Sequence, residues 1–169
     1  WVNGQAKIMV EPDMVVMSVG IESTSKLVSE SVQTVATDHA KLISILINKG
    51  IKKTEIKTSR YNINPQYKYT KDGSELTGYK VSHYSSFTYR DIDKIGDLID
   101  TISYGPKSIG DNLRINSINF SIENPKVFET KLRQNAIIDA ENKANEIAKF
   151  AHVLLGSPLY ISENSPINF

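Results

Sequence analysis

One stretch of the chain, residues 56–89, constrains the fold more than any other. It contains six of the chain's eight tyrosines, and β-branched and aromatic residues lie on both sides of the run Lys71-Asp72-Gly73-Ser74. Asp-Gly is a strong hairpin signal because glycine accepts a positive φ without a steric clash. We therefore predict two long strands joined by a tight turn. Pro65 inside the first arm indicates an edge strand or a bulge, because proline cannot donate to a sheet ladder.

The tyrosines of this hairpin have three possible roles. They can form cross-strand pairs, each worth about 0.2–1 kcal/mol. They can form a contact between subunits, where tyrosine is enriched. They can stack on nucleobases or sugars, but the 20 basic and 19 acidic residues leave a formal net charge of +1, and nucleic-acid binding demands a basic face. The first two roles are compatible, and we expect no nucleic-acid partner. The residues that we expect at a subunit interface are Tyr61, Tyr67, Tyr69 and Tyr79.

The other elements follow from changes of hydrophobic period along the chain. Residues 2–10 and 14–25 alternate between apolar and polar residues, which predicts two strands of a first hairpin. Apolar residues recur at steps of three and four over 27–48, 92–104 and 125–151, which predicts helices. Short alternating runs predict strands over 116–123 and 154–162. The predicted order, ββ-α-ββ-α-β-α-β, indicates an α+β fold with a largely antiparallel sheet and helices packed on one face.

Particular residues predict where the first helix begins and ends. Ser23, Thr24 and Ser25 offer N-cap oxygens before it. Gly50 stands where a left-handed residue would close it. The length of 169 residues suits a single domain, which we place at residues 1–163, with a tail at 164–169. No run of about 18 uncharged apolar residues is present, so we expect no membrane-spanning helix.

The sequence predicts no catalytic residue, no cofactor and no metal ligand. The chain has no cysteine, which excludes disulfides, zinc–thiolate sites and a thiol nucleophile. His39 lies in an apolar helical stripe, which favours a partly buried, hydrogen-bonded histidine over a metal ligand. Asp93, Asp97 and Asp100 could bind a hard cation, but carboxylates opposite an apolar stripe usually form the solvent face of a helix. No serine lies in a G-x-S-x-G turn.

Short runs spread along nearly the whole chain carry a resemblance to a known family. They are Val2-Asn3-Gly4-Gln5-Ala6, Val10-Glu11-Pro12-Asp13, Val19-Gly20-Ile21-Glu22, Lys49-Gly50-Ile51, Ile56-Lys57-Thr58, Tyr61-Asn62-Ile63-Asn64-Pro65-Gln66-Tyr67, Gly78-Tyr79, Arg90-Asp91-Ile92-Asp93 and residues 133–144. Taken in this order, they resemble the SIMPL-domain family, which includes bacterial periplasmic proteins linked to oxidative-stress defence and an immunogenic envelope antigen. The resemblance implies an exported α+β protein that self-associates, and it implies no catalytic residue.

The chain departs from the pattern of this family at two places. The link at residues 106–114 is longer than usual. His152 stands where a helix-ending glycine is expected, shortly before Leu155-Gly156. If the third helix still ends in a left-handed turn, His152 has a positive φ, which is uncommon outside Gly, Asn, Asp and His.

These observations lead to one functional expectation and two alternatives. We expect a non-enzymatic cell-envelope protein, periplasmic or otherwise exported, that forms a homo-oligomer and supports oxidative-stress defence, with a possible second protein partner. The first alternative is a binding module that captures a small ligand or a client peptide at the sheet edge near Pro65. A hydrolase is the least favoured alternative, because no set of nucleophile, base and orienting residue can be recognised.

Overall fold

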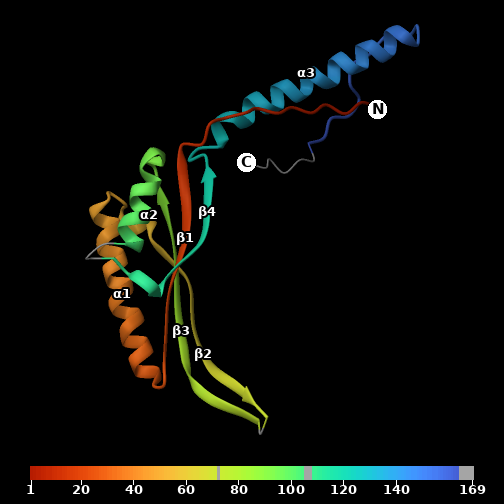
Figure 1. Cartoon of the computed structure of the whole chain (residues 1–169). Helices are drawn as coiled ribbons and strands as arrows, with labels where there is room; N and C mark the ends of the chain where they lie inside the picture. Colours follow the sequence, from red (N-terminus) through yellow and green to blue (C-terminus); the bar gives the residue numbers. More distant parts are fainter. Residues whose placement is uncertain (72, 105–107, 164–169) are drawn as a thin grey trace. The chain divides into compact units, whose positions relative to one another are not determined.

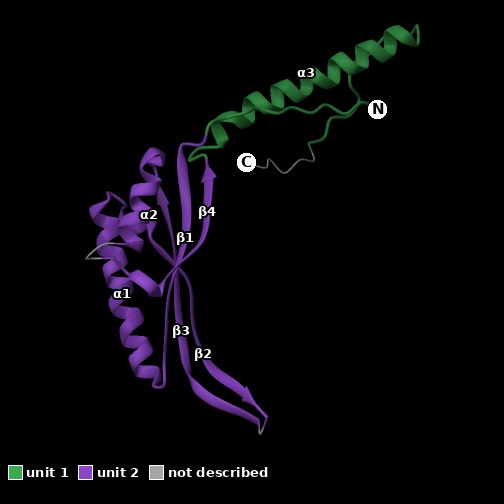
Figure 2. Ribbon diagram, in the orientation of Figure 1, with its two compact units in different colours: residues 1–11, 122–169 green, residues 12–121 purple. Residues whose placement is uncertain are grey.

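Segments from the two ends of the chain lie together in one unit of the structure, and the residues between them form another (Figure 2). The structure, a computed structural model, describes residues 1–71, 73–104 and 108–163. The larger unit spans residues 12–121, and the smaller unit joins residues 1–11 to the chain from residue 122 onward. The single domain expected over residues 1–163 stays a prediction, and the expected tail at 164–169 lies outside the described residues.

An antiparallel sheet with the strand order β2-β3-β1-β4 forms the larger unit (Figure 1). Its strands are β1 (Met14–Ser25), β2 (Lys57–Thr70), β3 (Gly73–Tyr89) and β4 (Leu113–Ser121). β1 is an inner strand, since it pairs with β3 along one edge and with β4 along the other. Consequently β2 and β4 are the two edge strands of this sheet.

Two helices, α1 (Val28–Asn48) and α2 (Ile95–Ser103), lie on the same side of this sheet (Figure 1). Alternate residues of β1 point toward them and form the centre of the core. The fully buried core side chains are Val15, Met17, Val19 and Ile21 of β1, Val35, Leu42 and Leu46 of α1, Val81 and Phe87 of β3, and Leu98 and Ile102 of α2. Burying one such side chain contributes roughly 1.5–3 kcal/mol. The predicted α+β class, an antiparallel sheet with helices, is confirmed.

The end of α1 is formed as predicted at Gly50. This residue has a φ of 88°, and the N–H of Ile51 donates to the carbonyl of Leu46 at 3.0 Å. A left-handed residue after a helix directs the following N–H back to a carbonyl of the last turn. The side chain of Ile51 is buried in the core, so this turn also attaches the helix to the sheet.

The start of α1 differs from the prediction. The N-cap residue is Leu27, and no side chain caps the helix there. β1 continues to Ser25, so the hydroxyls of residues 23–25 belong to the strand and not to the helix. The hydroxyl of Ser25 donates instead to the carboxylate of Glu30 in the first turn.

The long hairpin predicted around residues 71–74 is confirmed as β2 and β3, although Asp72 itself lies outside the described residues. The edge position and the bulge predicted from Pro65 are both found, since β2 is an edge strand and its register shifts between Gln66 and Tyr67. β1 ends where Ser25 pairs with Tyr79. Beyond that point the hairpin has no third strand among the described residues.

The predicted strands near the two ends of the chain are wrong. Residues 2–10 do not pair with residues 14–25, because β1 pairs with β3 and β4 instead. Residues 154–162 form no strand either. Alternation of apolar and polar residues indicates extended chain, but it does not identify the strand with which that chain would pair.

The smaller unit holds the longest helix of the described chain, α3 (Lys126–Phe150), and residues 1–11 run beside it as extended chain (Figure 1). The backbone N–H of Gln5 donates to the carboxylate of Asp139 at 2.8 Å. The alanines of α3 allow this extended segment to come close, since a Cβ atom on Gly4 would lie 1.9 Å from the carbonyl oxygen of Ala136 and 2.7 Å from the Cβ of Ala140.

α3 ends as predicted in a left-handed turn at His152. This residue has a φ of 55°, and no other non-glycine residue of the described chain has a positive φ. The N–H of Val153 donates to the carbonyl of Ala148 at 3.0 Å, and that of His152 to the carbonyl of Lys149 at 3.2 Å. This is the same closing arrangement as at Gly50, formed without glycine.

The three carboxylates noted at the second helix face solvent. Asp93, Asp97 and Asp100 are all exposed, which fits the solvent-face interpretation of these carboxylates. A search of the described residues for a helix long and apolar enough to cross a membrane finds none.

On the face of the sheet away from the helices, the ring of Tyr84 lies over Gly20. The two residues are direct partners in the register of β1 and β3. A Cβ atom on Gly20 would lie 2.5 Å from this ring, a distance that no relaxed contact allows. The strand therefore needs a glycine at this position so that the tyrosine can lie flat.

We predict that Gly20→Ala lowers the free energy of unfolding by about 1–3 kcal/mol, because the added methyl group displaces the Tyr84 ring. Urea denaturation followed by circular dichroism measures this change. The control is Gly96→Ala in α2, where a Cβ atom meets nothing within 4 Å. Alanine is the better helix former by about 1 kcal/mol, so the control should keep or gain stability. Equal effects of the two substitutions would contradict the close approach.

Candidate assembly surface

The tyrosines predicted at an interface do not all lie on the surface. Tyr61, Tyr67 and Tyr69 of β2 are exposed, with 46%, 52% and 84% of their surface accessible. Tyr79 of β3 is half-buried. Its carbonyl accepts a hydrogen bond from the hydroxyl of Ser31 in α1 at 3.0 Å, so this residue helps to attach the helix to the hairpin. Three of the four predicted side chains are thus available to a partner.

Two aliphatic residues lie on the same hairpin as the exposed tyrosines. Ile63 of β2 is exposed, and so is Leu76 of β3, which pairs directly with Tyr67. The register indicates that they share the helix side of the sheet with these tyrosines, because direct partners point to the same face. We call Tyr61, Ile63, Tyr67, Tyr69 and Leu76 the hairpin surface. The aliphatic members were missed because only the tyrosines stand out in the sequence.

The hairpin surface is open for two reasons. Tyr67, Tyr69 and Leu76 lie beyond Tyr79, where β1 stops, and α1 begins only at Val28. Tyr61 and Ile63 pair with His83 and Val81, at positions that β1 still reaches, but they lie on the edge strand β2. Exposed apolar side chains are common where two proteins meet. Tyrosine is enriched at such interfaces because its ring is apolar, while its hydroxyl can form a hydrogen bond at the polar rim of the interface. The arrangement can bury against another protein, and it offers no acid–base pair for catalysis.

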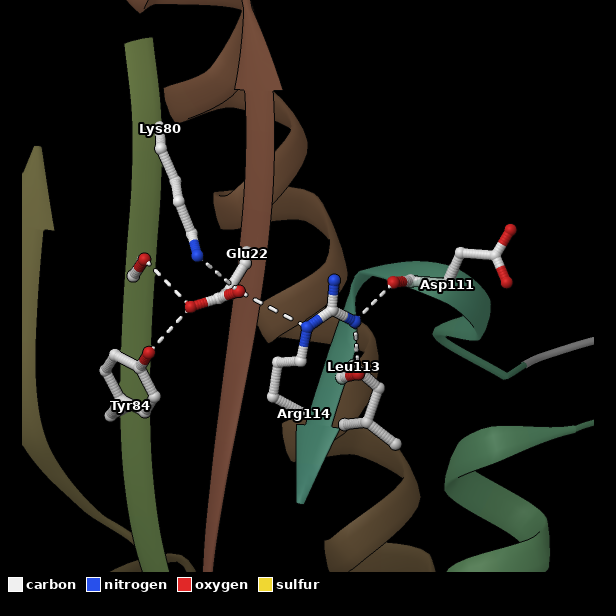
Figure 3. A network of polar contacts seen from close by, with 7 residues as sticks. Glu22, Lys80, Tyr84, Asp111, Leu113 and Arg114 are labelled. Atoms are coloured by element: carbon white, nitrogen blue, oxygen red, sulfur yellow. Dashed lines mark hydrogen bonds and ion pairs between the residues drawn. The ribbon is translucent and has the colours of Figure 1, made fainter. Parts of the chain in front are cut away.

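The opposite face of the sheet holds a polar network around Glu22 of β1 (Figure 3). The carboxylate of Glu22 accepts a hydrogen bond from the Tyr84 hydroxyl at 2.6 Å and lies 2.8 Å from the ammonium of Lys80. The guanidinium of Arg114 in β4 approaches it to 3.3 Å. A single carboxylate thereby links the three neighbouring strands β3, β1 and β4.

This network keeps Glu22 ionised. Burial by itself would raise the pKa of Glu22, but the hydrogen bond from Lys80, with those from Tyr84 and Ser82, lowers it below its usual value. The hydrogen bond to Glu22 in turn raises the pKa of Tyr84. An ionised carboxylate held by several donors is a poor proton acceptor, so we assign this cluster a structural role. The sequence did not reveal it, because its members are distant along the chain.

Two histidines from different elements stack against each other in the larger unit. His39 of α1 and His83 of β3 have ring centroids 3.7 Å apart and planes inclined by 17°. The Nε2 of His39 lies 2.9 Å from the hydroxyl of Ser85, and the Nε2 of His83 lies 3.0 Å from that of Thr58. The prediction of a partly buried, hydrogen-bonded His39 is confirmed. Its contact with His83 was not foreseen.

Both imidazoles are neutral at pH 7. Burial lowers the pKa of His39 to about 4, and the nearby His83 contributes in the same direction. Burial also lowers the pKa of His83. Two protonated rings at this distance would repel each other. In residues 1–71, 73–104 and 108–163, no group of three or more His, Cys, Asp or Glu side chains is placed to hold a metal ion.

A second apolar strip lies on β4, at the other edge of the sheet. Ile115, Ile118 and Phe120 pair with Val19, Met17 and Val15 of β1 and share the helix side of the sheet with them. Their β1 partners are fully buried, whereas these three side chains are exposed. We call them the β4 strip. The sequence predicted a strand over residues 116–123, but the exposure of its apolar side chains depends on where the helices lie.

Comparisons with known proteins place this chain among bacterial relatives. A family model described as "SIMPL: Protein of unknown function (DUF541)" matches residues 2–168. The chain is 30% identical over 169 residues to the "Uncharacterized protein YggE" of Edwardsiella ictaluri, covering 99% of this chain and 68% of that protein.

Two further relatives are similar over nearly the same region. The "26 kDa periplasmic immunogenic protein" of Brucella melitensis is 28% identical over 170 residues, which cover 97% of this chain and 66% of that protein. The "Uncharacterized protein YggE" of Escherichia coli K12 is 28% identical over 158 residues, which cover 94% of this chain and 62% of that protein. The chain therefore spans about two thirds of the length of these relatives.

We predict that the larger unit loses stability as the pH falls from 6.5 toward 4. The unfolded chain binds a proton at His39 near pH 6.5, whereas the folded chain binds it only near pH 4, so acid favours unfolding in this window. Urea denaturation at several pH values measures the slope. In the variant His39→Phe an aromatic ring can still stack against His83, but residue 39 can no longer be protonated. The free energy of unfolding of this variant should therefore change less steeply with pH. An unchanged slope would show that His39 does not control the effect.

Proposed function

Because the chain belongs to the SIMPL family, we propose that it is a non-enzymatic, exported cell-envelope protein that acts by self-association. The proposal joins a location and a mechanism. The location is supported by the printed name of the Brucella melitensis relative, which is called periplasmic. The mechanism is supported by the apolar surface that a single chain leaves uncovered.

This uncovered surface is the observation that carries the proposal. The hairpin surface projects from the sheet and holds three exposed tyrosines. In α3, a helix of 25 residues, Ala148 is the only described residue that is buried. Many large apolar side chains of the smaller unit are exposed. They include Trp1, Met9, Val127, Ile137, Ile147, Phe150, Leu154, Leu159 and Ile161. Exposed apolar surface of this extent is typical of proteins that bind other proteins.

The link to oxidative-stress defence is the least specific part of the proposal. It is supported only by the family resemblance. We test it by comparing peroxide survival of a strain that lacks the protein with strains that carry the wild type or an assembly-deficient variant. Equal survival of all three strains would remove the oxidative-stress role and leave self-association untouched.

A binding module is the alternative that one observation favours. β2 is an edge strand near Pro65, and an extended peptide can add to such an edge through backbone hydrogen bonds. A peptide or small ligand that binds there would raise the melting temperature of the chain. A hydrolase is the least favoured alternative, because the sequence shows no recognisable set of nucleophile, base and orienting residue.

We predict that replacing Tyr67 and Tyr69 together by serine weakens the oligomer without unfolding the chain. Both side chains are more than half exposed, so their loss costs little within one chain but removes aromatic contacts between chains. Light scattering after gel filtration, at two protein concentrations, gives the absolute mass. The wild type should show a stable multiple of 18.9 kDa, and the double variant a lower mass.

Tyr104→Ser provides the matched control. Tyr104 follows α2 and is 77% exposed, so this substitution also removes an exposed tyrosine, but outside the hairpin surface. It should leave the mass unchanged. If the double variant keeps the wild-type mass, the hairpin surface is not the contact. If the wild type is a monomer at both concentrations, self-association itself fails.

A further inference from the structure

The two edges of the sheet are protected to very different degrees. β2 carries Lys57, Arg60 and Lys68 together with Pro65, which are the devices that natural edge strands use against pairing with another copy. β4 carries neither a charged residue nor proline from Ile115 to Ser121. It does have a bulge at Asn116, where the register with β1 passes from Ser117 to Ile115, and a bulge also discourages pairing. The regular, uncharged stretch from Ser117 to Ser121 is therefore the place where another strand is expected to add.

The edge of β4 has no strand partner on its outer side. Within the described residues it pairs only with β1. The β4 strip lies beside this edge, and Ile118 and Phe120 are 37% and 55% exposed there. The polar residues Ser117 and Asn119 pair with Ser18 and Val16 on the opposite face of the sheet. The strand therefore offers an apolar row on one face and a polar row on the other.

We propose that β4 of one chain pairs antiparallel with β4 of a second copy, about a two-fold axis. This inference rests on the proposed self-association and adds a second contact, distinct from the hairpin surface. Each sheet would continue into the sheet of its partner. The apolar rows would then meet on one face of the joined sheet, and the polar rows on the other.

Charge favours a second copy as the occupant of this edge. A two-fold axis places each residue near its own counterpart, so any charge close to the axis faces an identical charge and opposes pairing. Residues 115–121 carry no charged side chain, so no repulsion between like charges opposes the pairing there. The nearest cation, Arg114, lies 3.3 Å from the carboxylate of Glu22 and is compensated within its own chain. The basic edge of β2 would repel its own copy instead.

Symmetry makes the pairing self-complementary. Opposite residues of an antiparallel pair point to the same face, so Ile118 and Phe120 meet apolar residues of the partner, and Ser117 and Asn119 meet polar ones. Such a two-fold contact closes after two copies. Growth beyond a dimer would therefore need a different surface, and the hairpin surface on the opposite edge strand can provide it.

The absence of cysteine from the chain allows a direct test of this pairing. We introduce single cysteines, one at a time, by Ser117→Cys, Ile118→Cys, Asn119→Cys and Phe120→Cys, and oxidise the full chain under mild conditions. A disulfide requires Cα atoms closer than about 7 Å, so only the residue nearest the axis can bond to its own copy. We expect disulfide-linked dimers to peak at one position and to fall on either side. The control is Gly96→Cys, at an exposed position of α2 outside both edge strands, which should give none.

A second variant tests the same contact without oxidation. Asn119→Lys places like charges near the axis and should weaken the β4 contact about tenfold, equivalent to roughly 1.4 kcal/mol. The mass by light scattering should fall, whereas Gly96→Lys, which adds the same charge at an exposed position of α2, should leave it unchanged. Far-UV circular dichroism confirms that each variant is folded.

The outcomes separate this inference from the function on which it rests. A peak of cross-linking at residues 117–120 together with a lower mass for Asn119→Lys supports the β4 contact. An oligomer that shows no such peak and ignores Asn119→Lys overturns it, while self-association through the hairpin surface stands. A wild-type monomer at every concentration overturns both.

Discussion

Strand β1 is the element on which the rest of the larger unit depends. Its alternate residues Val15, Met17, Val19 and Ile21 are fully buried beneath the two helices, and each of its edges is occupied by another strand. Its other face presents Glu22, whose carboxylate draws side chains from β3 and β4 toward the same strand. One strand thus organises an apolar layer on one face and a charged cluster on the other. Truncating a buried β1 side chain would create a cavity under both helices, a change that typically costs 2–5 kcal/mol in a well-packed core.

Local patterns predicted local structure well. The Asp-Gly turn between aromatic arms indicated the hairpin, and Gly50 indicated the end of α1. In both cases the relevant physics lies within a few residues of the chain. The left-handed residue at His152 was expected from the family resemblance instead. The expected pairing of residues 2–10 with 14–25 failed because alternation specifies an extended backbone and leaves its neighbour open. The contacts of His39 with His83 and of Glu22 with Arg114 could not be predicted for the same reason, since each joins elements far apart in the sequence.

For the candidate surface, tyrosine content identified the hairpin, but the partial burial of Tyr79 and the exposure of Leu76 depend on where β1 and α1 end.

The two edge strands show how one sheet can present different surfaces. β2 has basic side chains along its edge and exposed tyrosines on one face, whereas β4 has an uncharged edge beside an apolar strip. A basic edge with an exposed face favours contact through side chains. An uncharged edge favours contact through the backbone. The hairpin contact and the β4 contact are therefore different kinds of interaction and respond differently to substitution. Removing a tyrosine removes its aromatic packing, whereas strand pairing is blocked only by a charge or a proline.

The division of the chain between its units has a consequence for the order in which the protein folds. All four described strands and both helices that cover them come from the continuous segment 12–121. This unit can therefore complete its core while the later part of the chain is still being delivered. The smaller unit needs residues 1–11 and α3 at the same time, so its first segment must wait, without a partner, until more than a hundred intervening residues have emerged. Closing so long a loop is slow relative to local structure formation. During synthesis, the apolar residues among 1–11 thus stay exposed after the larger unit has completed its core.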